Sequence, residues 1–167
     1  MKMKQLKIGV VTSRFNSEIT EKLEDGAIQY LESCGAEILS VRVPGAVEIP
    51  IAAQALLDQG CDGVVVCGAV IRGDTSHYDL VCNSVERGIT ELMLEYKKPI
   101  GFGVITTEND EQAEARAGGA HGNKGQEAAQ VTVEMIGLLQ DLRSSKLKKS
   151  KSAVKKKSVK RTIKSRK

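Results

Sequence analysis

The sequence has no tryptophan, and its only aromatic residues are three tyrosines and two phenylalanines among 167 residues. Aliphatic side chains must therefore form the core, and an apolar fraction of 41% is enough for one. No apolar run approaches the roughly 18 to 20 residues of a membrane-spanning helix, so we expect no membrane span. Residues 1–6 lack the apolar segment and cleavage site of a signal peptide, and we expect a cytoplasmic protein.

Cysteine and histidine are also scarce. The cysteines include no C-x-x-C pair, and the only histidines, His77 and His121, do not have zinc-finger spacing. We therefore predict neither a metal site nor a disulfide framework. We expect free, buried thiols at all four cysteines: Cys34, Cys61, Cys67 and Cys82.

Acidic residues are missing from the end of the chain. Residues 143–167 contain 13 lysines and arginines and no Asp or Glu, whereas residues 1–142 carry a net charge of −9. Such a Lys/Ser-rich segment cannot bury enough apolar surface to fold, so we predict a folded domain at 1–142 and a disordered tail at 143–167. The tail could be a solvated extension without function, a contact with nucleic acid or an anionic surface, or an expression artefact or assembly aid.

Short apolar runs alternate with amphipathic segments along residues 7–142. The runs predict strands at residues 7–12, 37–43, 63–68 and 100–105. Helical spacing predicts helices between Asn16 and Gly35 and at about 50–59, 79–97, 109–117 and 126–142, with a glycine-rich loop at 118–125. This alternation predicts an α/β protein: a flavodoxin-like three-layer α/β/α sandwich with a four-stranded parallel sheet.

Ligands of open α/β sheets bind beyond the carboxyl ends of the strands. The segments that follow the four predicted strands should therefore converge on one rim. They are residues 13–16, 44–48, 69–77 and 106–107. This reasoning predicts the place of a site and leaves its reaction open.

The segment after the third strand is the richest in polar groups. Residues 73–76 form a short turn that can offer backbone N–H groups and hydroxyls to a phosphate. His77 follows, and a histidine can transfer protons near neutral pH. An ordinary loop with a helix-capping histidine is the alternative.

Other rim residues also have two interpretations. Phe15 stands alone in a polar turn, where it could stack on a flat ring or act as a hydrophobic staple. Glu48 could bind a ligand or cap its own helix. We expect Arg14 and Arg72 to be structural or surface residues.

The glycine-rich segment 118–125 combines flexible backbone with cations that suit a phosphate. Lys124 lies in it, with Arg116 just before it and Glu127 just after. The segment is no Walker P-loop, because Lys124 is followed by glycine and the segment joins two helices. We therefore do not expect it to bind a nucleoside triphosphate.

Five motifs, in this order, resemble those of the lumazine synthase family. They are S-R-F-N at 13–16, P-G-x-x-E-I-P at 44–50, G-x-x-I-R-G-x-T-x-H at 68–77, F-G-V-I-T at 102–106 and R-A-G-x-x-H-G-N-K-G at 116–125. The resemblance covers residues 7–142. It implies a transferase of riboflavin biosynthesis that needs no cofactor or metal. The implied reaction condenses 5-amino-6-ribitylamino-2,4(1H,3H)-pyrimidinedione with 3,4-dihydroxy-2-butanone 4-phosphate, giving 6,7-dimethyl-8-ribityllumazine, phosphate and water.

The resemblance also implies a role for each site residue. His77 transfers protons, and Arg116 of a neighbouring subunit binds the phosphate together with Asp74 and Thr75. The pyrimidine and its ribityl chain are held by Phe15, Ala46, Val47, Glu48, Ala69, Val70 and Ile71, with Phe102 from the neighbour. Lys124 and Glu127 support the site.

The family implies a homopentamer, and twelve pentamers form a 60-subunit shell in some members. The compact 118–125 segment favours the shell here. The sequence departs from the family pattern in three ways. Ala46-Val47 replaces the Ser-Trp pair of some members, Asp74 places a carboxylate beside the expected phosphate, and the N-terminus is short.

Three other functions are compatible with parts of this pattern. An archaeal-type riboflavin synthase resembles the family but dismutates the lumazine. A shell or nucleic-acid packaging protein would keep the motifs without catalysis, and a flavodoxin-like binding module would bind flavin without turnover.

Overall fold

The computed structural model describes residues 5–144, so residues 145–167 of the predicted tail lie outside it. Four parallel strands form one sheet in the order β2-β1-β3-β4. Their bounds are Lys7–Ser13 for β1, Glu37–Val43 for β2, Gly63–Ile71 for β3 and Ile100–Thr107 for β4. Strand order and direction place the carboxyl ends of all four strands at one edge of the sheet.

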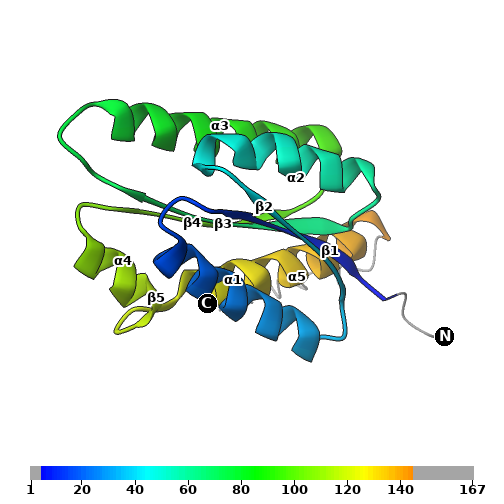
Figure 1. Ribbon diagram of the computed structural model, residues 1–167. Coiled ribbons are helices and arrows are strands. Elements are labelled where there is room, and N and C mark those ends of the chain that lie inside the picture. The colour runs from blue at the N-terminus through cyan, green and yellow to red at the C-terminus, as the bar shows by residue number, and fades with distance from the viewer. Residues whose placement is uncertain (1–4, 145–167) are drawn as a thin grey trace, which may run out of the picture.

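Helices cover both faces of this sheet (Figure 1). Helices α2 (Ile49–Asp58) and α3 (His77–Tyr96) lie on one face, and α1 (Ser17–Ser33), α4 (Asp110–Arg116) and α5 (Lys124–Arg143) lie on the other. The predicted three-layer sandwich is therefore confirmed. No helix among residues 5–144 is long and apolar enough to cross a membrane.

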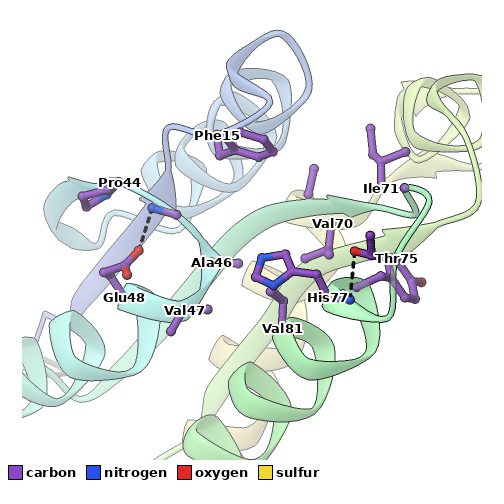
Figure 2. Close-up of a pocket in the computed structure, with 14 residues that line it drawn as sticks. Phe15, Pro44, Ala46, Val47, Glu48, Val70, Ile71, Thr75, His77 and Val81 are labelled. Carbon is purple, nitrogen blue, oxygen red and sulfur yellow. Dashed lines mark hydrogen bonds between the residues drawn. The ribbon is translucent and has the colours of Figure 1, made fainter.

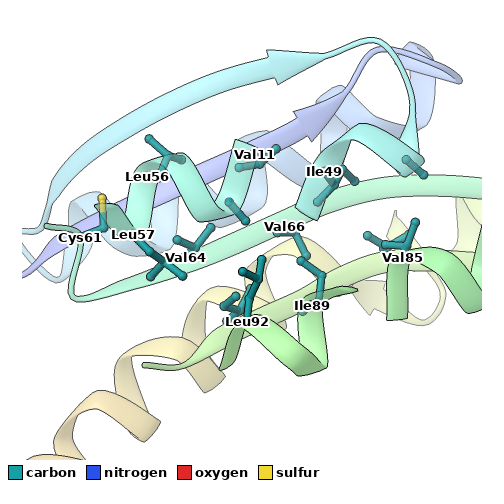
Figure 3. Close-up of a cluster of buried hydrophobic side chains, with 14 of the residues drawn as sticks. Val11, Ile49, Leu56, Leu57, Cys61, Val64, Val66, Val85, Ile89 and Leu92 are labelled. Atoms are coloured by element: carbon teal, nitrogen blue, oxygen red, sulfur yellow. The ribbon is translucent and has the colours of Figure 1, made fainter. Parts of the chain in front are cut away.

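Alternating side chains of the two central strands fill a core on each side of the sheet. Val64 and Val66 pack against Ile49 and Ile89 from α2 and α3 (Figure 3). Val65, which lies between them in the strand, points to the opposite face and packs in the cluster that α1 and α5 complete. Strand β3 is buried on both faces because it has a strand on either side and helices above and below, which explains its continuous apolar run.

Several predicted boundaries near the rim were wrong. Strand β4 continues to Thr107, so residues 106–107 belong to the strand and do not follow it. Strand β3 continues to Ile71, because its pairing with β4 extends from Val64–Ile100 to Ile71–Thr107. Residues 69–71 therefore belong to the strand and do not follow it. Helix α3 begins at His77, two residues before its predicted start.

The glycine-rich segment is more ordered than a loop. Strands β5 (Ala117–Gly119) and β6 (Gly122–Asn123) pair in a small antiparallel hairpin, with left-handed backbone at Gly118 and Gly122. The Asn123 side chain accepts a hydrogen bond from the Gln126 backbone N–H and caps α5, which begins at Lys124. Lys124 thus lies at a helix start with a defined position.

The four cysteines are free thiols in different environments. Cys61 and Cys67 are buried, Cys82 is half-buried and Cys34 is exposed. Burial was therefore wrongly predicted for Cys34, which follows the last turn of α1.

Candidate functional site

A cavity of about 630 Å³ opens at the carboxyl edge of the sheet, where the sequence placed a site (Figure 2). Its walls come from the turn after β1, the 3-10 turn η1 (Ala46–Glu48) before α2, the end of β3 and the start of α3. Most of the predicted residues line it: Phe15, Ala46, Val47, Glu48, Ala69, Val70, Ile71, Thr75 and His77.

The Phe15 ring lies at the mouth of this cavity and is 71% exposed. That exposure contradicts the staple interpretation, which requires packing against the helix. Asn16, the next residue, has left-handed backbone, and its side chain does not cap α1. Its amide donates instead to the Ala69 carbonyl oxygen at 3.0 Å. The Phe15 turn is therefore fixed to the strand that forms the cavity wall.

The Glu48 side chain makes no capping hydrogen bond to α2 and closes the short η1 turn before it instead. Its carboxylate accepts a hydrogen bond from the Gly45 N–H at 2.9 Å, which closes the turn before α2, and it also lines the cavity. Ala46 is buried and Val47 is about half exposed, so this wall is largely apolar. One acceptor therefore lies beside an apolar surface.

His77 is the first residue of α3 and is exposed to the cavity. In Figure 2 its imidazole points across the cavity toward Ala46 and Val47. Its backbone N–H lies 3.4 Å from the Thr75 hydroxyl oxygen, and Thr75 also lines the cavity. Asp74 is exposed and, unlike Thr75, does not line this cavity.

Four of the other predicted residues gather in a second cavity of about 460 Å³, along edge strand β4 and the start of α5. Arg116 donates to the Gln112 carbonyl oxygen at 3.0 Å, and the Lys124 ammonium lies 2.7 Å from a Glu127 oxygen. The two cavities share no lining residue. Within one chain, His77 and Arg116 therefore open onto separate cavities. The lining includes the predicted Phe102, Arg116, Lys124 and Glu127.

A family model for 6,7-dimethyl-8-ribityllumazine synthase matches residues 5–140. The chain belongs to this family. The 6,7-dimethyl-8-ribityllumazine synthase of Bdellovibrio bacteriovorus is 71% identical over 141 residues, which cover 84% of this chain and 79% of that protein. The 6,7-dimethyl-8-ribityllumazine synthase of Cytophaga hutchinsonii is 48% identical over 77% of this chain and 83% of its own length. That of Desulfovibrio desulfuricans is 46% identical over 83% of this chain and 92% of its own length.

The first cavity of this lumazine synthase family member is also lined by Pro44, Gly45 and Gly73, which belong to the predicted rim segments. Sequence reasoning missed two further lining residues, Tyr78 and Val81. Tyr78 had a usable signal, since it is one of five aromatic residues in the chain and directly follows His77. Val81 had none, because an apolar residue one turn into a helix is normally predicted as core. In the part of the chain that the structure describes, no three His, Cys, Asp or Glu side chains form a metal-binding group.

Proposed function

We propose that this chain condenses 5-amino-6-ribitylamino-2,4(1H,3H)-pyrimidinedione with 3,4-dihydroxy-2-butanone 4-phosphate in a site shared by two neighbouring subunits. Membership of the 6,7-dimethyl-8-ribityllumazine synthase family supports the reaction. The proposal of a shared site is supported by the separation of the predicted residues into two different cavities of one chain. Each subunit gives one cavity to one neighbour and the other cavity to the next.

The first cavity binds the pyrimidine. Phe15 offers an exposed aromatic face on which a flat ring can stack. The buried end of β3 forms an apolar wall, and Glu48 supplies an acceptor for ribityl hydroxyls. A few polar groups in an apolar cavity are typical of small-molecule sites.

The keto-phosphate binds beside it, between the two subunits. The Gly73–Ser76 turn and the Thr75 hydroxyl face its phosphate from one side, and the neighbour's Arg116 faces it from the other. A guanidinium can hold a phosphate through two parallel N–H donors and stabilise it as it leaves. Lys124 and Glu127 support that half of the site.

The reaction needs proton transfers and the meeting of two substrates. The pyrimidine's amine attacks the ketone, and loss of water gives an imine. Elimination then releases phosphate, and the second amine closes the ring with loss of another water. His77 moves the protons, as an imidazole can near neutral pH. Holding both substrates together supplies much of the acceleration.

The unpaired side of β4 and the adjacent face of α5 favour assembly into a homopentamer. Phe102 is 42% exposed and Val131 is 51% exposed, and Leu138 and Leu142 continue the apolar face along α5. A ring of heterologous contacts covers this face on every subunit and completes every site. The compact β5–β6 hairpin further supports a 60-subunit shell.

The decisive experiment supplies purified protein with both condensation substrates, or with 6,7-dimethyl-8-ribityllumazine alone. We expect lumazine absorbance and equimolar phosphate from the two substrates, and no product from the lumazine. Riboflavin formed from the lumazine would indicate a riboflavin synthase instead. Tight flavin binding without product in either reaction would indicate a binding module.

We propose a second role for the basic segment, which lies beyond the family match at 5–140. It carries 13 Lys and Arg over residues 143–167, and an unbalanced cationic chain binds nucleic-acid phosphates through counterion release. Arg143, the first residue of this segment, donates to the Lys97 carbonyl and lines a shallow cavity with Lys97 and Lys98. We expect DNA binding that weakens with salt and is lost in a chain ended at Ser144. Equal binding by both chains would contradict this role.

A further inference from the structure

The Arg72 side chain joins three segments at the edge of the first cavity. Its Nε donates to Glu108, in the connection from β4 to α4, at 2.8 Å. Its two terminal nitrogens lie 3.4 Å from the two carboxylate oxygens of Asp79, in the first turn of α3. The guanidinium carbon also lies 4.0 Å from the centre of the Tyr78 ring, within the range of a cation–π contact.

These contacts bracket the turn that carries the phosphate-facing groups. Residues 73–76 connect β3 to α3 and are all exposed, and Gly73 and Thr75 line the cavity. Among the described residues, the side-chain hydrogen bond within this turn is a long one: the His77 N–H donates to the Thr75 hydroxyl oxygen at 3.4 Å. Just before the turn, the Arg72 backbone N–H donates to the Thr107 carbonyl oxygen at 2.8 Å. The turn is thus held mainly from its two ends.

We propose that Arg72 is a positioning residue that fixes the 73–77 turn, and with it Thr75 and His77, by joining the start of α3 to the β4–α4 connection. This role deepens the function proposed above and rests on it. Without the guanidinium, the side-chain link from Glu108 to Asp79 is lost, and Tyr78 loses the cation over its ring. The turn then keeps only its backbone anchors.

The geometry requires arginine at this position. The planar guanidinium stacks its face on the Tyr78 ring, and the nitrogens at its edge reach the carboxylates of Glu108 and Asp79. A lysine ammonium cannot do both. Exposed ion pairs are individually weak. Three contacts on one rigid group nevertheless restrict where the first turn of α3 can lie. Small displacements matter here, because a misplacement of about 1 Å can cost a reaction roughly 100-fold.

Steady-state kinetics with each substrate varied in turn tests this role. For Arg72→Ala we expect kcat to fall about tenfold, part of the roughly 100-fold that misplacement can cost. We also expect a higher KM for the keto-phosphate. The KM for the pyrimidine should change little, since Phe15 and Glu48 come from other segments. Arg72→Lys should recover part of the loss, and Arg87→Ala, at an exposed arginine of α3, is the matched control.

Glu108→Gln separates positioning from direct contact with the phosphate. Positioning predicts a smaller defect of the same kind, because Glu108 holds Arg72 from outside the cavity. If Arg72 bound the phosphate itself, removing a competing carboxylate would leave that KM unchanged or lower it. Either of those results would overturn the proposal.

Other outcomes would also overturn it. They are an equal rise of both KM values, a kcat loss that matches a loss of folded protein by circular dichroism, and kinetics like those of wild type. A wild-type protein that forms no lumazine would contradict the proposed function itself. An active wild type without the split between the two KM values would contradict only the role of Arg72.

Discussion

The Asn16 side chain donates to the Ala69 carbonyl oxygen at 3.0 Å, joining residues that are 53 positions apart in the sequence. The neighbouring Phe15 N–H donates to the Pro44 carbonyl oxygen at 3.1 Å. The turn that carries the exposed ring is thus bonded to two other segments of the cavity. Because these bonds fix its backbone, Phe15 can stay exposed without local packing.

Replacing Asn16 tests this link. Asn16→Gly tolerates the left-handed backbone but loses the side-chain hydrogen bond, whose removal costs about 1 kcal/mol. Asn16→Ala also places a Cβ in the left-handed region, at a further cost of about 1 kcal/mol. We expect both to raise the KM for the pyrimidine, with unfolding free energy lower for Ala than for Gly in urea titrations. An unchanged KM in both variants would show that the link does not position Phe15.

A shared site predicts complementation between two defective variants. His77→Ala removes the proton-transfer group of one cavity, and Arg116→Ala removes the phosphate ligand of the other. We expect each alone to lose most activity, with Arg116→Ala weakening mainly the use of the keto-phosphate. When both are dissociated and reassembled together, about a quarter of the sites in a random ring combine two intact halves. Activity that stays at the level of the separate variants would place both residues in one chain's site.

Substituting alanine for either of two glycines of α5 should change the stability of the protein in opposite directions. A Cβ at Gly125 would lie 1.9 Å from the Leu23 carbonyl oxygen of α1, whereas a Cβ at Gly137 meets nothing within 4 Å. Overpacking of this severity destabilises by about 3 kcal/mol or more, so Gly125→Ala should unfold far below wild type. Gly137→Ala should gain about 0.5 kcal/mol from reduced freedom of the unfolded chain. Denaturant midpoints in the reverse order would contradict the close approach of α1 and α5.

The buried thiol of Cys67 predicts a pH dependence of stability above pH 9. Burial raises the pKa of Cys67 to about 12 from a usual value of 9.0. Below pH 9 the thiol is protonated in both states and has no effect. As pH rises from 9 to 12, the unfolded chain releases a proton that the folded protein keeps, so this group lowers stability by up to about 1.4 kcal/mol per pH unit.

Comparison of wild type with Cys67→Ala isolates that contribution. The variant should lose stability less steeply between pH 9 and 12 in urea titrations, even if its absolute stability is lower at every pH. Thiol labelling provides a second measurement: exposed Cys34 should react in the native protein, and Cys67 only after unfolding. Parallel pH profiles, or fast native labelling of Cys67, would be inconsistent with its burial.

The sequence alone determined the elements and the edge at which the site lies. Apolar runs, helical spacing and turn residues are local signals, so four strands and five helices could be located to within a few residues. Their alternation fixed a parallel sheet, and a parallel sheet places every strand's carboxyl end at the same edge. The motif order then indicated the family.

Tertiary structure alone decided which residues share a cavity. Strand order puts β4 at an edge, so Phe102 and Arg116 line a different cavity from His77 although they lie on the same chain. Likewise, the amide of Asn16 bonds to Ala69 and not to its own helix, because β3 lies beside β1. Such contacts depend on strand order and register between segments far apart in sequence, which local spacing does not specify.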